Sequence, residues 1–340
     1  MEILQVLVYL VFAVAVISYA ALDGFDLGVG CLHLFAKSNK DRRIFLNAIG
    51  PVWDGNSLWI VISTGVIFAG FPPVFAAVTS GFYLPVLLIV AMFMFRAASL
   101  EFRSKTENLH WRAFWDLCFC LSSFVMAFDL GMVLGNMARG VPLDEMGNMI
   151  PDQLDFFNAY AFSIGALATA LFIMHGALYL LMKTEGALQK QIKSWMPFLI
   201  GGFLLFWFIA TTMTFTTEQQ MLHRMNHSPS LWIVAILSLG SFFSVIRCVI
   251  KKKYGLAFIS SVVAIALFVA LFCIGTFPYL LPSTVNAAEN SMTIFNSSSS
   301  FITLLTLTII AATGVPLFYY YASYVYRTFR GKVEVGKHSY

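Results

Sequence analysis

Residues 55–95 read GNSLWIVISTGVIFAGFPPVFAAVTSGFYLPVLLIVAMFMF, a stretch without a single Asp, Glu, Lys or Arg. A helix that spans a bilayer needs about 20 consecutive apolar residues, so this stretch can hold two such helices. Phe71, Pro72 and Pro73 mark the turn between them. Residues 254–288 and 291–326 are also free of charged side chains. This pattern indicates an integral membrane protein.

The composition of the whole chain agrees with this class. Hydrophobic residues make up 59% of the 340 residues and charged residues 11%, whereas a soluble domain carries about 25% charged residues. The chain is therefore predicted to be all-α, with nine transmembrane helices and no soluble domain. The expected spans are residues 3–35, 51–70, 75–102, 112–137, 157–182, 194–215, 231–250, 255–280 and 301–326. The acidic start of the first span is not typical of a cleavable signal peptide.

The basic residues predict the orientation of these helices. All but three of the 21 Lys and Arg residues lie in alternate loops or in the C-terminal tail, the exceptions being Arg96, Arg139 and Arg224. The positive-inside rule places such loops in the cytoplasm, so the N-terminus is expected outside and the C-terminus in the cytoplasm. The net charge of +4 thus reflects topology, and no nucleic-acid partner is expected. The five cysteines lie in or near predicted helices and predict neither a disulfide framework nor a metal site.

Two acids, Asp23 and Asp26, lie inside the first predicted helix. A carboxylate within the hydrocarbon layer costs roughly 2.5–3.5 kcal/mol on insertion scales, so it marks a partner, a water-filled path or a substrate. At about 100° per residue, Tyr19, Gly30 and His33 share the face of the two acids. This polar stripe suits a chain of water molecules from the cytoplasm. The alternative is structural, with the acids neutral or hydrogen-bonded to neighbouring helices.

Two glycines of the same helix, Gly24 and Gly28, lie on a different face. Their spacing of four is the small-xxx-small pattern, which lets a second helix approach closely. We therefore expect a packing face there, separate from the polar stripe.

A second polar cluster begins the next helix, with Pro51, Trp53, Asp54, Asn56 and Trp59. Proline suits the first turn of a helix and an acid suits its positive end, so an ordinary helix start is one interpretation. The amide and the tryptophans make the segment more polar and aromatic than such a start requires. A functional role is the second interpretation.

These segments, with others along essentially the whole chain, resemble subunit II of cytochrome bd quinol oxidases. The matching segments are LDGFD (22–26), GPVWDGN (50–56), SGFY (80–83), FRSK (102–105), GALYL (176–180) and FPYLLPS (277–283). The resemblance implies a multi-pass subunit of a bacterial inner-membrane complex that oxidises ubiquinol or menaquinol and reduces oxygen to water. It also implies two four-helix bundles, at residues 1–140 and 156–282, followed by a ninth helix and tail at residues 283–340.

The resemblance further implies the cofactors and partners. Two b-type haems and one d-type haem are expected on subunit I, the obligate partner, and no haem is expected in this chain. A structural ubiquinone or menaquinone and small accessory membrane subunits occur in some members of the family. Lipid and quinol complete the expected partners.

Site residues are carried over at the matching positions. The resemblance implies that Asp23, Asp26 and Asp54 line a proton route, which Tyr19 and His33 of the polar stripe would support.

Two further residues receive roles. Trp59 is expected near a lateral oxygen entrance. Arg96 is expected to be the counter-charge of Asp54, Glu101 or Asp116, with snorkelling to the lipid headgroups as the alternative.

Three positions stand apart. His175 lies well inside a predicted helix, and we expect it to bond a neighbouring helix rather than to bind haem. Asp129 departs from the apolar residue that the family pattern leads us to expect. The connection at about residues 216–230 is expected to be short.

Two other functions are compatible with the sequence. A secondary transporter or channel would use the buried acids to bind a cation, but the Gly-Asp segment has no clear counterpart in the second half of the chain. A purely structural scaffold for subunit I is the other.

Overall fold

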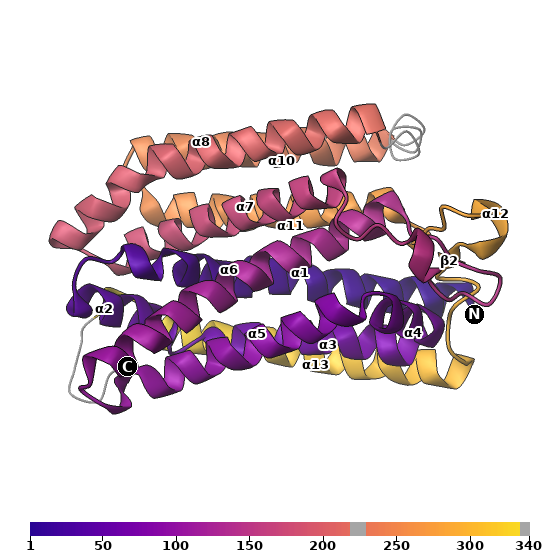
Figure 1. The fold of residues 1–340 in the computed structure, drawn as a ribbon, viewed down its shortest axis with the longest axis horizontal. Helices are drawn as coiled ribbons and strands as arrows, with labels where there is room; N and C mark the ends of the chain where they lie inside the picture. The colour runs from indigo at the N-terminus through magenta and orange to yellow at the C-terminus, as the bar shows by residue number, and fades with distance from the viewer. Residues whose placement is uncertain (218–228, 334–340) are drawn as a thin grey trace.

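The computed structural model describes residues 1–217 and 229–333. Its long helices lie side by side along one axis, with α1 (Glu2–Leu32) running through the middle (Figure 1). The other helices are α2 (Asn39–Ile49), α3 (Trp53–Gly70), α4 (Pro72–Gly81), α5 (Tyr83–Phe102), α6 (Leu109–Arg139), α7 (Ala159–Lys183), α8 (Gly186–Thr217), α10 (Pro229–Ile250), α11 (Tyr254–Thr276), α12 (Ala287–Asn290) and α13 (Phe301–Thr328), with three short 3-10 turns (His33–Phe35, Arg103–Lys105, Pro151–Gln153). Two short strands, β1 (Tyr279–Leu281) and β2 (Met292–Thr293), pair antiparallel beside the N-terminus.

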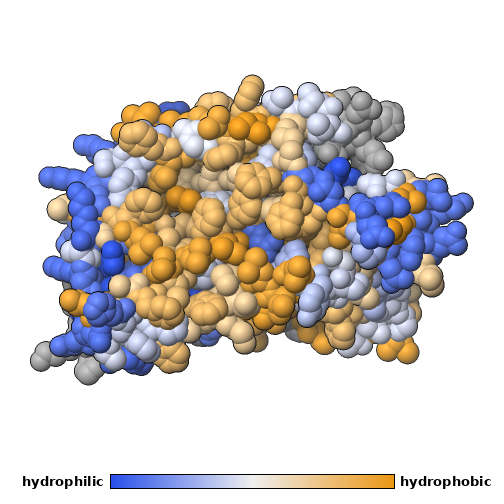
Figure 2. All heavy atoms as spheres, in the orientation of Figure 1, coloured by the Kyte–Doolittle hydropathy of each residue, from blue (hydrophilic) through white to orange (hydrophobic). Residues whose placement is uncertain are grey.

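The surface and the helix lengths are those of a multi-pass membrane protein. Eight of the described helices are long and apolar enough to cross a membrane, and α2 with α3 makes a ninth if this pair, bent by 51°, forms one span. On the face shown in Figure 2, apolar residues cover the middle of the molecule and hydrophilic ones gather at its two ends. The exact count of nine and the orientation of the termini remain predictions.

One end of the molecule collects the basic connections. The connections after α1, α5, α7 and α10 and the end of α13 lie together there, and we call it the basic end (Figure 1). The β1–β2 pair lies at the opposite end.

Two predicted spans and one expected loop differ from the observed structure. The predicted helix at residues 75–102 is broken at Phe82, which separates α4 from α5. α2 fills part of the expected loop after the first helix, and the side chain of Ser38 accepts a hydrogen bond from the backbone N–H of Asp41 to cap it. α8 begins at residue 186 rather than 194 because its first turns carry Lys190 and Lys193, which an apolar-span criterion leaves out.

The predicted packing face of α1 is confirmed. A Cβ atom on Gly28 would collide with the backbone of Phe172 and Gly176 in α7, so only glycine allows this crossing. Gly30 was expected on the polar stripe, and it also makes room for a neighbour, since a Cβ there would overlap the side chain of Ser123 in α6.

The last helix, α13, packs against α1 and α3. Ser300 caps its start, because its side chain accepts a hydrogen bond from the backbone N–H of Thr303. α1 contacts α3 and α6 of the first expected bundle and α7 and α11 of the second. The division at residues 140 and 282 therefore remains a prediction. The connection expected at residues 216–230 lies largely outside the described residues.

Candidate functional site

Asp23 is held by an arginine in the middle of the protein. The Arg96 guanidinium, from α5, donates from Nη1 to Asp23 Oδ2 at 2.9 Å and from Nη2 to Oδ1 at 2.7 Å. Ser57 of α3 lies 2.8 Å from Asp23 Oδ1 through its Oγ atom. Arg96 is 1% exposed and Asp23 0%. This two-point ion pair is therefore buried and fixed in direction.

The predicted partners of Arg96 are wrong. Arg96 forms its ion pair with the carboxylate of Asp23. The sequence had suggested Asp54, Glu101 or Asp116. Snorkelling is also excluded because the side chain is buried. The helical wheel gave the face of each acid but not the residue opposite it.

Asp26 has a different environment. Its Oδ2 accepts a hydrogen bond from Asn56 Nδ2 at 2.8 Å, and Asn56 Oδ1 accepts one from the hydroxyl of Tyr326 in α13 at 2.8 Å. Asp26 is 0% exposed, and its Oδ1 has no hydrogen-bond partner among the described residues. None of the ion pairs in residues 1–217 and 229–333 includes it. Within the described residues, Asp26 is thus a buried acid that forms no ion pair.

The third carried-over acid, Asp54, lies elsewhere. It is in the first turn of α3 and is exposed, whereas Asn56 and Ser57 of the same turn face the buried acids. The structure thus brings Asp23 and Asp26 together with Arg96 but leaves Asp54 at the surface. Its position matches the ordinary helix start.

Trp59 is fully enclosed. Its ring lies 4.9 Å from that of Phe318 and 5.0 Å from that of Tyr319, both in α13. Together with Tyr19 and Ala15 it forms a small apolar cluster between α1, α3 and α13.

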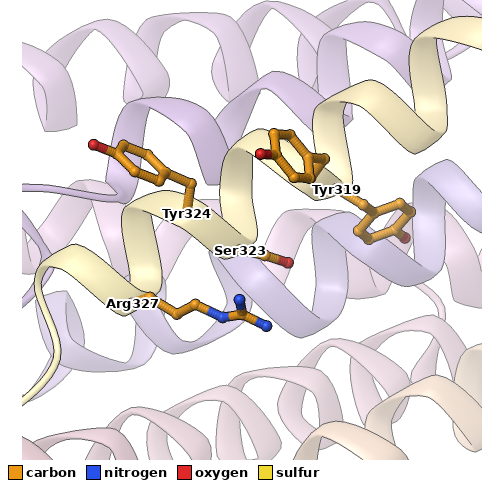
Figure 3. Close-up of a pocket in the computed structure, with 5 residues that line it drawn as sticks. Tyr319, Ser323, Tyr324 and Arg327 are labelled. Carbon is orange, nitrogen blue, oxygen red and sulfur yellow. The ribbon is translucent and has the colours of Figure 1, made fainter.

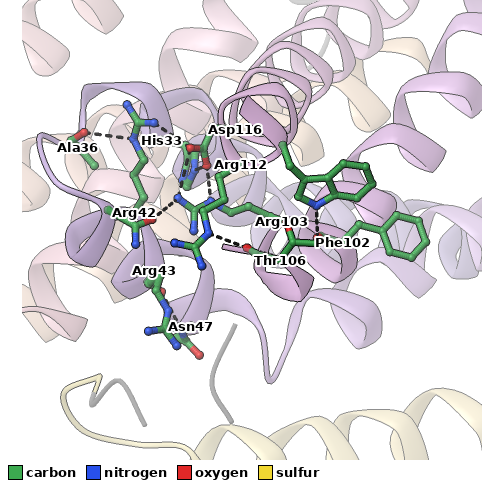
Figure 4. Close-up of polar contacts among 12 residues, drawn as sticks. His33, Ala36, Arg42, Arg43, Asn47, Phe102, Arg103, Thr106, Arg112 and Asp116 are labelled. Atoms are coloured by element: carbon green, nitrogen blue, oxygen red, sulfur yellow. Dashed lines mark hydrogen bonds and ion pairs between the residues drawn. The ribbon is translucent and has the colours of Figure 1, made fainter. Parts of the chain in front are cut away.

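A second polar cluster, centred on Asp116, lies at the basic end (Figure 4). The Asp116 carboxylate accepts from Arg42 Nη1 at 2.7 Å, and from Arg103 Nε at 2.5 Å and Nη2 at 3.2 Å. It also contacts Nε2 of His33 at 2.5 Å. Arg103 and His33 are buried, while the Arg42 side chain is 28% exposed. Sequence reasoning named His33 but gave Asp116 the wrong partner and missed both arginines.

Four buried polar atoms without a hydrogen-bond partner among the described residues follow the polar stripe of α1. They are His33 Nδ1, Ser123 Oγ, Asp26 Oδ1 and Tyr19 Oη. Ser123 belongs to α6 and lies against Gly30. From residue 33 to residue 19 the helix rises about 21 Å, at about 1.5 Å per residue. The unpaired atoms therefore form a row from the basic end toward the middle of the protein.

His175 makes the expected bonds to neighbouring helices. Its Nε2 donates to the backbone oxygen of Ala21 at 3.0 Å, and its Nδ1 lies 2.7 Å from Ser261 Oγ in α11. Both ring nitrogens are engaged, so this histidine does not fit a haem ligand. Asp129 is 5% exposed, and its Oδ2 is a further unpaired atom within the described residues.

A hollow of about 390 Å³ follows α13 (Figure 3). It is lined by Tyr319, Tyr320, Ser323, Tyr324 and Arg327. Since a single helix supplies this whole lining, the hollow is a surface groove and lies apart from the two acids.

The order of motifs and the buried acid–arginine pair lead to a comparison with known proteins. The family model for cytochrome bd terminal oxidase subunit II matches residues 4–329. The chain belongs to this family. It is 30% identical over 367 residues to cytochrome bd-I ubiquinol oxidase subunit 2 of Escherichia coli K12, which covers 98% of this chain and 96% of the relative.

Two further relatives agree. Cytochrome bd ubiquinol oxidase subunit 2 of Bacillus subtilis is 30% identical over 328 residues, covering 96% of each chain. The fold matches a chain of the bd oxidase from Geobacillus thermodenitrificans with a TM-score of 0.79 at 18% identity, over 97% of this chain and 99% of that one. The resemblance inferred from the motifs is therefore confirmed.

Proposed function

We propose that this chain is the non-haem subunit II of a cytochrome bd-type quinol:oxygen oxidoreductase in a bacterial inner membrane. Its obligate partner is subunit I, which carries the two b-type haems and the d-type haem. Support comes from the family membership and from relatives named as ubiquinol oxidase subunits. The basic end faces the cytoplasm in this proposal, in line with the positive-inside rule.

The proton route is carried by one observation, the row of unpaired buried atoms along α1. Buried polar groups are almost always hydrogen-bonded, to protein or to ordered water. Several unpaired ones in a row are therefore places for a chain of bound water, which relays protons. The row begins beside Asp116, whose ion-pair partner Arg42 reaches the surface, and it continues to Asp26.

The two buried acids take different parts in this proposal. Among the described residues, Asp26 has one oxygen without a hydrogen-bond partner and forms no ion pair, so it is the group that takes up a proton and passes it on. Asp23 is bound to Arg96 at two points and acts as a positioning group that keeps α1, α3 and α5 in register around Asp26. Asp54, exposed in the first turn of α3, is proposed to collect protons at the surface.

Oxygen access is the second part of the proposal. Trp59 lies in an apolar cluster, and oxygen is an apolar molecule. We therefore keep Trp59 as part of the wall of an oxygen route toward the partner subunit. The transporter alternative is weakened, because Arg96 occupies the carboxylate of Asp23 that a cation would need.

The test is the variant Asp26→Asn, which keeps the shape and removes the exchangeable proton. In the intact complex, quinol-driven oxygen consumption should fall about tenfold or more, as for loss of a positioned acid. Reduced-minus-oxidised spectra should stay unchanged. Asp152→Asn, at an exposed position in an outer turn, is the matched control and should behave as wild type.

Other outcomes separate the alternatives. Full turnover by Asp26→Asn with intact spectra would refute the proton route and favour a scaffold. Loss of the d-type haem signal would mean that the acid supports assembly instead.

A further inference from the structure

A hollow of about 300 Å³ lies at the basic end, between α7, α11 and α13. This volume is at the lower bound of small-molecule pockets, which are about 300–1,000 Å³. Its lining includes three cationic residues, Lys183, Arg330 and Lys332. It also includes apolar and aromatic residues, namely Met182, Phe258 and two tyrosines. None of the lining residues in the described part of the chain carries a carboxylate.

The Lys183 ammonium is buried, and no carboxylate of the described residues forms an ion pair with it. Its Nζ donates to the backbone oxygen of Phe329 at 2.6 Å and lies 5.6 Å from the centre of the Tyr179 ring. Lys183 as a whole is 8% exposed. An ammonium has three donors, so donors remain for a ligand.

The segment after α13 brings the other two cations to the same place. Lys332 Nζ donates to the backbone oxygens of Met182 at 2.9 Å and Thr184 at 2.7 Å. The backbone N–H of Val333 donates to the backbone oxygen of Lys183. Burial lowers the pKa of Lys332, while Glu185 acts in the opposite direction.

The three cations have no ion-pair partner within residues 1–217 and 229–333. Three positive charges around one pocket attract an anion, and among the described residues only Lys332 has an opposing charge acting on it, that of Glu185, so the arrangement favours an anionic ligand. Arg330 suits a phosphate because a guanidinium donates two parallel hydrogen bonds to it, and lysine adds point charge.

We propose that this pocket binds a phosphate group, a chemistry shared by the headgroup of an anionic phospholipid and by free inorganic phosphate. The apolar residues in the same lining favour the lipid, whose glycerol and acyl carbons would lie against Met182 and Phe258. Basic pockets between transmembrane helices are suited to such headgroups.

The pocket also reaches the buried acids. Tyr326 lines it and donates to Asn56, which donates to Asp26. An occupant would thus fix the end of α13 that carries this tyrosine. The binding proposal itself does not rest on the proton route, because its test measures the ligand and not turnover.

The experiment uses the intact complex, exchanged into lipid-free detergent and titrated with phosphatidylglycerol under native mass spectrometry. The wild-type complex should bind one lipid molecule. The Arg330→Gln/Lys332→Gln variant should bind it roughly tenfold more weakly, because it lacks two cations near the headgroup. Lys251→Gln, also exposed at the basic end, should bind as wild type. Should the double variant fail to assemble, Arg330→Gln alone decides, with a smaller loss in the same direction.

A parallel arm separates the two sources of phosphate. Inorganic phosphate alone, added to the lipid-free complex, should leave the thermal midpoint unchanged. A rise in the wild-type midpoint that the double variant lacks would keep the site and identify free phosphate as its ligand. Equal lipid binding by all variants with no effect of phosphate would overturn the proposal.

Discussion

Replacing Arg96 by methionine tests how the buried acids are held. The change leaves Asp23, which is 0% exposed, without the cation that binds it at 2.7 and 2.9 Å. Breaking a buried ion pair on one side costs about 3–5 kcal/mol. Since about 1.4 kcal/mol changes an equilibrium constant tenfold, the folding constant falls by roughly two to nearly four powers of ten. We expect the intact complex to be recovered in much lower yield.

A second variant makes this prediction specific to the charge. Arg96→Met combined with Asp23→Leu removes both charges, and replacing a buried pair by apolar residues is often neutral. Ser57 keeps an acceptor in that variant, since its Oγ already lies 2.8 Å from the backbone oxygen of Trp53. The double variant should therefore be more stable than Arg96→Met alone.

The assay is the free energy of unfolding of the purified complex, obtained by titration with sodium dodecyl sulfate. The reasoning is refuted if Arg96→Met unfolds at the wild-type concentration, or if the two substitutions simply add.

Three further predictions follow from other parts of the structure. Asp116→Asn leaves two buried or half-buried arginines without their carboxylate, and the same titration should show a loss of about 3–5 kcal/mol. Gly28→Val places a side chain into the backbone of α7 and should lower the unfolding free energy by about 1–3 kcal/mol or more, whereas Gly201→Val, with open space around it, should not. The backbone N–H of Asn148 holds the pKa of Asp144 below its usual value. A lowered pKa stabilises the folded turn above the ordinary value of about 3.9, and this stabilisation is lost as pH falls through the folded pKa, so amide protection in the turn should drop there.

Contrary results would be informative in each case. A wild-type titration for Asp116→Asn would mean that the arginines find other anions. Equal stability of the two glycine variants would remove the close crossing of α1 and α7. Amide protection that is unchanged at low pH would show that the Asp144 carboxylate does not hold its turn.

The helical content and the faces of α1 followed from the sequence because both depend on local periodicity. Gly24 and Gly28 were separated from Asp23 and Asp26 by the helical wheel alone. Most helix ends agree with the predicted spans to within a few residues. The break at Phe82 was not predicted, although Ser80, Gly81 and Pro85 flank it, because the charge-free stretch was divided only at residues 71–73.

The partners of the polar residues could not be predicted in the same way. Arg96 lies 73 positions from Asp23, and Asn56 lies 270 positions from Tyr326. No periodicity connects such positions, since they meet only when helices pack. Exposure was also misjudged, because Asp54 looked equivalent to the two buried acids in a polar cluster.

The cluster around Asp116 shows a further limit. Its two arginines, Arg42 and Arg103, lie in basic loops and indicate, from the sequence, only the orientation of the helices. Both instead turn inward to the carboxylate of Asp116. The positive-inside pattern is a statement about loops and does not separate a solvated cation from a buried one.

The long separation of Asp23 from Arg96 has a consequence for the order of biosynthesis. The first helix leaves the ribosome with its acid while the arginine is 73 residues behind, which is about 4–15 seconds at about 5–20 residues per second. During that interval α1 must wait near water or at the insertion machinery, because its ion pair does not yet exist. Tyr326, which completes the bonds around Asp26, arrives last, so a chain truncated before α13 would carry an unfinished site.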